Sequence, residues 1–580
     1  MKLLEREDLL SSLQVLLRNA AAGQGALLFL EGEAGIGKTS LLRAFAESQR
    51  DRVPVYWGAC DALQTPRPLG PLFDIAGQIK GELQAALDGN AGRLQIFSRF
   101  LAELVRPPAL IVLEDLHWAD EATLDFLRYV GRRIGRTHSL LIVSFRSDEV
   151  GPSHPLRLVL GDLATSGAQR LSPQPLSVAA IQELVGDRDV DAAELQQKTG
   201  GNPFFVTEVV AAGGVAMPAT VRDAVLARAT RLRPSARAIL DAAAVAGPRI
   251  EPWLLQELTG AESSWIDECL DTGVLRAQNG LFVFRHELAR EAILDALTPT
   301  KAMSLHRMVL QALKSRSTVD LARLAHHAEG AALEDAVLEL APAAAREAAA
   351  KGAHRQAAQQ FARALKFATA PTAQRATLLD DYASECQLGG MVSDAIDARR
   401  SAVTLWQDLG ERSQQAISLA RLAHALVVAG KNAESEVTMR SAASLVANDS
   451  SDAAALVVRR WGAHLRMLDR DVAHAIHEGE LAKVIAEQRG DRESIVHCLN
   501  TIGSSLIIAG QVDEGCAQLE RSRSLADEIR SDFWVGSAFV NLGSACGEVY
   551  RFDLADNYLR QGIDFCSDRD IDFSRLYQLS

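Results

Sequence analysis

The feature that most constrains the fold of this chain is the segment Gly32–Thr39, where glycines at 32, 35 and 37 precede a Lys-Thr pair. An apolar stretch of strand length, Ala26–Leu30, comes before it, and a segment with helical spacing follows. This is the G-x-x-x-x-G-K-[ST] phosphate loop in its strand–loop–helix context. Glycines let backbone N–H groups turn inward towards phosphate oxygens, and the following helix adds the positive end of its dipole. The sequence therefore predicts a nucleotide-binding α/β domain.

The side chains of the loop predict which nucleotide groups are held. Lys38 is expected to neutralise the β and γ phosphates of ATP or ADP, and the Thr39 hydroxyl is expected to bind Mg²⁺. The predicted nucleotide-binding residues of this segment are Gly32, Glu33, Ala34, Gly35, Ile36, Gly37, Lys38, Thr39 and Ser40.

Length and charge limit the remaining possibilities. The 580 residues are too many for a single core, so a multidomain protein is expected. A formal net charge of −13 argues against nucleic-acid binding by the chain as a whole, because phosphate contacts need a basic footprint. The N-terminus carries charged residues among its leucines, unlike a signal peptide, and no uncharged apolar run is long enough to cross a membrane. We expect a cytoplasmic protein that does not enter a membrane.

Short, wholly apolar runs mark buried strands in the first part of the chain. Residues 53–58, 109–113 and 140–145 fit strands of a parallel sheet, with helical stretches around 70–88, 93–105 and 121–135 between them. The predicted P-loop NTPase domain covers residues 1–158. Residues 177–216 show two helical patterns, and residues 159–216 are expected to form a helical lid. Residues 217–315 show helices followed by a short aromatic strand, which suggests a winged-helix domain.

The rest of the chain, residues 316–580, is alanine-rich and repetitive. Breaks recur at 352, 390, 430, 470, 510 and 550, with separations of 38, 40, 40, 40 and 40 residues. A small residue stands five positions after each break. Such spacing is typical of stacked helical hairpins, so we expect an all-α superhelix of TPR-like repeats with a period of about 40 residues. The chain stops early in what would be a further repeat, which suggests a truncated solenoid.

An acidic pair ends one of the predicted strands. Glu114 and Asp115 follow the apolar run Leu110–Leu113, and in a P-loop protein the end of such a strand faces Mg²⁺ and the attacking water. Glu114 is therefore a candidate metal ligand, and Asp115 a candidate base that orients the water. The alternative is a plain helix N-terminus, where aspartate is also favoured.

These residues also carry a family resemblance. The segments Gly32–Thr39 and Leu113–Asp120, together with Cys60–Leu63 and Pro66–Leu72, resemble the STAND class of signal-transduction ATPases, and more closely the large ATP-binding LuxR-type (LAL) regulators. The resemblance implies ATP or ADP with Mg²⁺ as cofactors, slow hydrolysis of ATP to ADP and phosphate, and a role in transcription regulation. The acidic strand departs from the family pattern, because Glu114 stands where related ATPases usually have aspartate.

Three further site residues come from the resemblance. Arg146 matches a sensor arginine that reads the γ-phosphate, but a surface ion pair with Asp148 or Glu149 would also explain it. Pro203 matches a lid proline near the nucleotide, although a proline that starts a helix is an alternative. His286 matches a histidine that contacts the β-phosphate of ADP, although Glu287 follows it in place of aspartate. The neighbours His326 and His327 point to different helix faces and lack a third ligand, so a metal site there is not expected.

The resulting hypothesis is an ATP-dependent signalling switch, the sensor and ATPase part of a LuxR-family transcription regulator. Its repeats would bind an unknown protein or small-molecule effector, and nucleotide would control self-association. Family members carry a DNA-binding helix–turn–helix that this sequence lacks, so we expect no specific DNA binding by this chain alone. Two alternatives are a stand-alone ATP-regulated protein-binding scaffold, and an energy-coupled ATPase with substantial turnover.

Overall fold

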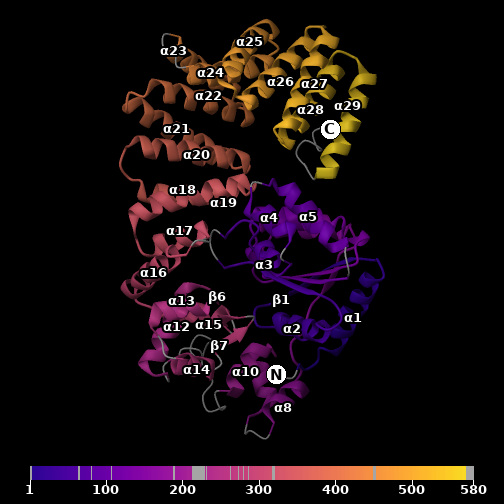
Figure 1. Cartoon of the computed structure of the whole chain (residues 1–580), viewed down its shortest axis with the longest axis vertical. Coiled ribbons are helices and arrows are strands. Elements are labelled where there is room, and N and C mark those ends of the chain that lie inside the picture. Colours follow the sequence, from indigo (N-terminus) through magenta and orange to yellow (C-terminus); the bar gives the residue numbers. More distant parts are fainter. Residues whose placement is uncertain are drawn as a thin grey trace. The chain divides into compact units, whose positions relative to one another are not determined.

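The chain forms two compact units, Met1–Phe367 and Ala368–Ser580. In the computed structural model of Figure 1, the first unit contains both sheets and many helices, and the second is all helical. The predicted order, a parallel-sheet domain followed by a long helical region, is confirmed. The structure describes residues 3–62, 66–79, 81–89, 91–105, 108–186, 190–211, 229, 232–260, 263–271, 274–278, 280–284, 287–316, 320–447 and 452–569.

A five-stranded parallel sheet in the order β2-β3-β4-β1-β5 positions the phosphate loop. The sequence predicted four of its strands. The fifth, β5, was missed because it is three residues long and largely exposed, so it carries no hydrophobic periodicity. It lies within residues 159–216, for which the sequence predicted a helical lid and no strand. The strands are β1 (Ala26–Gly32), β2 (Val55–Ala59), β3 (Leu110–Glu114), β4 (Leu140–Arg146) and β5 (Gln169–Leu171).

Helices cover both faces of this sheet because alternate strand residues point in opposite directions. Leu28 and Leu30 pack with α1 (Glu7–Ala21) and α2 (Lys38–Gln49) in one core. On the other face α6 (Glu121–Gly131) lies so close that a Cβ atom on Gly131 would be 3.1 Å from Leu27 Cδ2. The other helices of this part are α3 (Gly70–Ile79), α4 (Glu82–Asp88), α5 (Arg93–Val105), α7 (Pro155–Ala164) and the single turns η1 (Leu116–Trp118) and η2 (Ile134–Arg136).

Three helices and a small antiparallel sheet follow. The segment after β5 holds α8 (Val178–Val185), α9 (Ala192–Thr199) and α10 (Pro203–Ala211), which share a core with Leu4 from the N-terminus. Figure 1 shows the N-terminus beside α8 and α10. Further on, β8 (Leu281–Phe284) pairs with β6 (Arg249–Ile250) and β7 (Leu275–Gln278), so the expected short strand is present. Its helices are α12 (Pro234–Ala246), α13 (Pro252–Thr259), α14 (Ser263–Asp271) and α15 (Glu287–Asp295).

The first unit also includes helices α16 to α19. The start of α6 contacts α19, since the Glu121 backbone N–H donates to Gln356 Oε1 over 3.3 Å and Glu121 Oε2 accepts from the Arg355 N–H over 3.2 Å. A Cβ atom on Gly352 would lie 3.2 Å from an Arg93 nitrogen. These contacts join the α/β domain to the helical hairpin of residues 334–367. The helices are α16 (Pro299–Lys314), α17 (Leu321–Gly330), α18 (Glu334–Ala350) and α19 (His354–Phe367).

The second unit is a series of antiparallel helical hairpins with regular turns. The predicted break residues all have left-handed backbone conformation, including the non-glycine residues Arg470 (φ 62°) and Tyr550 (φ 59°). The helices are α20 (Ala373–Leu388), α21 (Val392–Asp408), α22 (Arg412–Val428), α23 (Asn432–Val446), α24 (Asp452–Leu468), α25 (Val472–Arg489), α26 (Arg492–Ile508), α27 (Val512–Glu528), α28 (Asp532–Glu548) and α29 (Phe552–Arg569).

The small residue after each break lies where two helices approach closely. Ala357, Ala395, Ser435, Ala475 and Ala555 are all buried. Gly515 shows a very close approach, because a Cβ atom there would lie 2.6 Å from the Gly503 carbonyl oxygen on α26. A small residue at this place therefore allows the paired helices to approach closely.

A buried polar cluster joins three helices at the start of the second unit. Asp380 on α20 accepts hydrogen bonds from Trp406 Nε1 over 2.9 Å and from Ser418 Oγ over 2.6 Å. The same carboxylate pairs with the buried guanidinium of Arg399, which also donates to Ser384 Oγ over 2.6 Å.

Replacing Asp380 with alanine should lower the free energy of unfolding by about 3–5 kcal/mol, because it leaves the Arg399 charge buried and unpaired. Urea unfolding of the full chain, followed by far-UV circular dichroism, measures the change. The control is Asp397→Ala, which removes an exposed carboxylate paired with Arg400 and should cost less than about 1 kcal/mol. Equal losses in the two variants would contradict the assignment.

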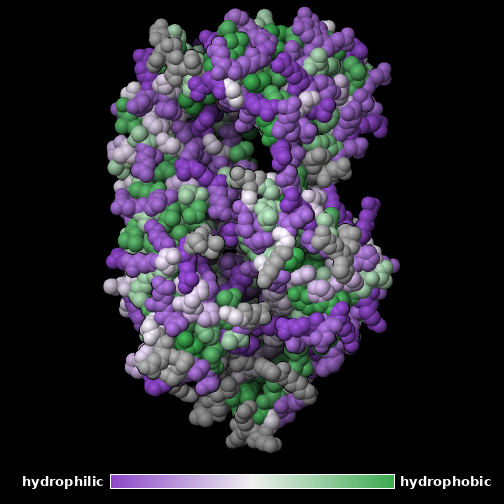
Figure 2. Space-filling model, viewed as in Figure 1, coloured by the Kyte–Doolittle hydropathy of each residue, from purple (hydrophilic) through white to green (hydrophobic). Residues whose placement is uncertain are grey.

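The surface mixes polar and apolar residues. Figure 2 shows hydrophobic residues scattered among hydrophilic ones on the visible face. Single exposed apolar side chains such as Leu158 and Tyr550 are ordinary on a globular surface. Within the described residues, no helix has the length and apolar character needed to span a bilayer.

Candidate functional site

The phosphate loop lies between β1 and α2, as predicted. Gly35 (φ 79°) and Gly37 (φ 100°) have backbone conformations that side-chain-bearing residues rarely adopt, and α2 begins immediately after Gly37. The free N–H groups at the start of α2 therefore face the loop, which is the geometry of an anion site. Thr39 is half-buried in the first turn of α2, and Ser40 is exposed.

Lys38 is folded back onto its own loop. Its side chain is 7% exposed, and Nζ donates to the carbonyl oxygens of Gly32 over 2.6 Å and Glu33 over 3.0 Å. Burial lowers the pKa of Lys38 to about 8, and the neighbouring Asp115 carboxylate opposes that shift. The ammonium group therefore remains mostly protonated at neutral pH and is available to an anion.

Three carbonyl groups of the loop are held from outside. Asn202 Nδ2 donates to Ala34 O over 2.9 Å, the Phe204 N–H to Gly35 O over 3.3 Å, and Arg6 Nη2 to Ile36 O over 3.3 Å. In a trans peptide the C=O and the next N–H point in opposite directions. Holding these carbonyls therefore turns the following N–H groups towards the other side of the loop, where a phosphate would bind.

Two of these three residues, Asn202 and Phe204, belong to the Gly201–Phe205 motif that the sequence predicted to lie near the nucleotide. Pro203 is half-buried and is the first residue of α10, a position where proline is common, and its role at the nucleotide stays a prediction. Its neighbours Asn202 and Phe204 make the contacts to the loop. Packing is tight, since a Cβ atom on Gly35 would lie 2.7 Å from Phe204 Cβ.

The third residue, Arg6, belongs to no sequence motif and was not predicted to contact the loop. It is a buried arginine in a charged N-terminal segment, and its Nη2 also donates to Gln174 O over 2.8 Å. Glu5 beside it accepts from the Ser177 N–H over 2.9 Å. Together these residues tie the N-terminus, the loop and the segment before α8 to one another.

The acidic pair lies at the carboxyl end of β3. Glu114 is 6% exposed, and its Oε2 accepts from Trp57 Nε1 over 3.0 Å. Among the described residues, Glu114 Oε1 is buried and finds no hydrogen-bond partner. Asp115 has left-handed backbone conformation (φ 57°), and its N–H donates to Ser144 Oγ over 3.3 Å.

This donor set fits a magnesium ion. Mg²⁺ prefers carboxylate, hydroxyl and water oxygens, and the unsatisfied Glu114 Oε1 is a buried oxygen that needs a positive partner. One cationic neighbour was not foreseen. Arg43 on α2 is electrostatically coupled to both Glu114 and Asp115, although burial lowers its pKa.

Arg146 ends β4 directly beside the loop, because Arg146 pairs with Gly32 in the sheet register. Its guanidinium carbon lies 4.8 Å from the centre of the Trp118 ring. Arg146 Nη1 forms an ion pair with Glu149 in this structure, which is the alternative weighed from the sequence. Arg146 is also close enough to Lys38 that its positive charge helps to lower the pKa of Lys38.

His117, in the turn after the acidic pair, is buried and neutral. Burial, followed by the charges of Arg146 and Lys38, lowers the pKa of His117 to about 2. Its Nδ1 accepts from the Arg146 backbone N–H over 3.4 Å. The remaining predicted site residue, His286, lies outside the described residues, so its placement stays a prediction.

A link from the small sheet to the edge of the parallel sheet was missed. Arg249 on β6 contacts Asp61 Oδ1 over 2.8 Å and Asp74 Oδ2 over 2.5 Å. Asp74 Oδ2 also accepts from the Ala59 N–H over 3.2 Å, and Ala59 pairs with Glu114 in the sheet register. The small sheet is therefore connected to the acidic pair through one strand end.

Comparison with known proteins agrees with an ATPase domain at the N-terminus. Residues 2–143 match the family model described as AAA ATPase domain. An uncharacterised protein of Rhizobium meliloti (strain 1021) is 27% identical over 439 residues, which are 63% of this chain and 42% of that protein. The chain thus matches less than half the length of this curated relative.

Solved structures of low sequence identity resemble this chain. A Signal Transduction ATPase with Numerous Domains (STAND) protein with a tetratricopeptide repeat sensor, from Pyrococcus horikoshii, is 15% identical with a TM-score of 0.48 and covers 99% of this chain and 84% of its own. The ORC2 protein of Aeropyrum pernix is 14% identical with a TM-score of 0.27, and the match covers 54% of this chain and 96% of that one.

Proposed function

We propose that this chain is an ATP-binding signalling switch of the STAND class, the sensor and ATPase part of a LuxR-type transcription regulator. The observation that carries the proposal is the phosphate loop, whose carbonyl groups are held by the lid through Asn202 and Phe204. A bound nucleotide and the lid would thus act on opposite sides of the same peptide groups. Occupancy of the loop would therefore change the lid contact.

Each candidate residue has a distinct part in this proposal. Lys38 would exchange its bonds to Gly32 O and Glu33 O for bonds to phosphate oxygens. Thr39 and Glu114 would hold Mg²⁺, which neutralises phosphate charge when bound. Asp115 would accept a proton from the attacking water, giving slow hydrolysis to ADP and phosphate. Arg146 would leave Glu149 to reach the γ-phosphate.

The second nucleotide state would be read by the segment that includes the small sheet. The resemblance assigns His286 to the β-phosphate of ADP and assigns a winged-helix domain to its surroundings. Arg249 supports coupling of this segment to the site, because it bridges Asp61 and Asp74 beside the Glu114 strand. The TPR-like helices would bind an effector, and nucleotide state would control self-association.

The Asn202→Ala variant tests whether the contact between the lid and the phosphate loop responds to bound nucleotide. Loss of its hydrogen bond to Ala34 O should weaken ATP binding by about fivefold, from about 1 kcal/mol for one hydrogen bond. It should also reduce the difference in hydrogen exchange of α10 between the ATP-analogue and ADP states. Calorimetric titration and hydrogen–deuterium exchange measure the two effects.

The matched control is Asn19→Ala, which removes an exposed asparagine side chain on α1 and should change neither quantity. Wild-type protein whose α10 exchanges identically with an ATP analogue and with ADP would contradict the switch. If Asn202→Ala weakens ATP binding but α10 of the wild type exchanges equally in both nucleotide states, the chain binds ATP without acting as a switch.

A further inference from the structure

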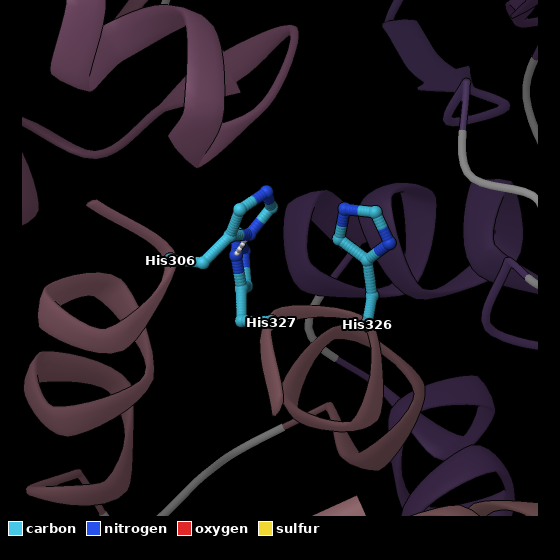
Figure 3. Close-up of side chains that lie close together, drawn as sticks. All are labelled: His306, His326 and His327. Atoms are coloured by element: carbon cyan, nitrogen blue, oxygen red, sulfur yellow. Dashed lines mark hydrogen bonds between the residues drawn. The ribbon is translucent and has the colours of Figure 1, made fainter. Parts of the chain in front are cut away.

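Three histidine side chains converge between α16 and α17, away from the phosphate loop. His306 lies on α16, and His326 and His327 are neighbours on α17. The ring centres are 5.1 Å apart for His306 and His327, 5.1 Å for His326 and His327, and 5.4 Å for His306 and His326. Figure 3 shows the His306 and His327 rings together, with the His326 ring beside them.

The sequence predicted no metal site here, because His326 and His327 are adjacent on a helix and no third ligand was apparent. The prediction that a third ligand is absent was wrong. The third imidazole comes from the preceding helix, and the rings of the two neighbours approach each other. One ring nitrogen from each histidine can be chosen so that all three lie within 4.8 Å of one another.

The nitrogen separations suit a tetrahedral ion. His306 Nδ1 and His327 Nδ1 are 2.9 Å apart and share one hydrogen bond. Bonds of about 2.0–2.1 Å from imidazole nitrogen to Zn²⁺ place two ligands of a tetrahedron roughly 3.3–3.4 Å apart. This separation is longer than the observed 2.9 Å and falls within the 4.8 Å limit that holds for one nitrogen of each ring, so modest rotation of the rings is sufficient.

Neutral imidazole is the form of histidine that binds metal. The three rings differ in exposure, since His327 is 1% exposed and His306 and His326 are half-buried. Because all three ligands are imidazoles, the donor set selects zinc-like ions over Mg²⁺ or Ca²⁺.

The charges around the cluster are mixed. Arg363 and Arg290 oppose a positive charge at His326, whereas Glu329 on the same helix favours it. Arg363 Nε is itself paired with Glu329 Oε2 over 2.7 Å, which reduces its effect. Neutral imidazoles also bind a divalent ion without losing a proton, so binding carries no cost of deprotonation.

We propose that His306, His326 and His327 bind one divalent transition-metal ion, with Zn²⁺ the best fit, and that the ion cross-links α16 to α17. Water would occupy the fourth tetrahedral position. The clamp would stiffen the connection between the small sheet and the helices that follow it, because Arg323 on α17 also donates to Oε1 of Glu251, the residue before α13, over 2.8 Å.

The test uses the full chain, freed of metal by chelation and titrated with Zn²⁺ alone, without nucleotide. Metal content after gel filtration should be one Zn²⁺ per chain for the wild type. His306→Gln and His326→Gln should each bind at least about 100-fold more weakly, because loss even of an outer-shell partner costs 10–100-fold. Zn²⁺ should raise the melting temperature of the wild type and leave that of the variants unchanged.

The control is His474→Gln, which replaces an exposed histidine on α25 that contacts Asp471 and should keep wild-type binding. Circular dichroism verifies folding of each variant, and His326→Gln serves if His306→Gln fails to fold. Co²⁺ in place of Zn²⁺ should give a tetrahedral nitrogen-ligand spectrum. A sulfur-to-cobalt charge-transfer band, or equal Zn²⁺ affinity in the wild type and both cluster variants, would overturn the proposal.

Discussion

Replacing Lys38 with alanine is expected to weaken binding of ATP·Mg²⁺ by about 100-fold, which corresponds to the loss of roughly 3 kcal/mol in charge-assisted hydrogen bonds. The structure supports this size of effect, because Lys38 is almost fully buried beside the loop and carries a proton at neutral pH. Its two carbonyl contacts hold the ammonium group where phosphate oxygens would arrive. Nucleotide content after purification and calorimetric titration measure the change.

Lys198→Ala is the matched control for Lys38. Lys198 is a half-exposed residue on α9 that pairs with Glu194, and its loss should leave ATP affinity within about twofold. The assembly state of the Lys38 variant should also no longer respond to ATP. Unchanged ATP affinity in Lys38→Ala would refute nucleotide binding at this loop.

Asp115→Asn is expected to slow ATP hydrolysis by about 10²–10⁴-fold, the usual contribution of a general base. Asparagine is the substitution of choice here, because Asp115 has left-handed backbone conformation and asparagine tolerates that conformation. ATP binding should therefore survive while turnover is lost. Single-turnover measurement of phosphate release separates the two effects.

The matched control is Asp51→Asn. Asp51 is an exposed aspartate after α2, so this variant should hydrolyse ATP at the wild-type rate. If Asp115→Asn keeps the wild-type single-turnover rate, the base must be another group, and the role assigned to Asp115 fails. A fall in both ATP affinity and rate would instead place Asp115 in binding.

Local patterns in the sequence were sufficient for much of the fold. A buried strand followed by glycines and Lys-Thr can form few structures other than a phosphate loop, because the glycines must adopt positive φ values. The repeated breaks were equally informative. Arg470 and Tyr550 were assigned to turns from the period alone, and both have the left-handed conformation of a helix end.

Residues that act across long sequence distances gave no such pattern. Asn202 stands next to the predicted site residue Pro203, but it is the Asn202 side-chain amide that donates to Ala34 O. Arg6 and Arg249 are single arginines in ordinary surroundings, and only folding brings them to the loop and to the Asp61–Asp74 pair. The short strand β5 likewise depends on pairing with β1 rather than on its own residues.

The histidine cluster also depends on residues that only folding brings together. His326 and His327 were visible as neighbours, but a third ligand on α16 becomes a neighbour only when α16 packs against α17. The sequence by itself determined the phosphate loop, the acidic strand end and the repeat period, since each follows from the conformational limits of consecutive residues. Tertiary structure alone decided which distant side chains hold that loop and converge on α17, because long-range packing brings them together.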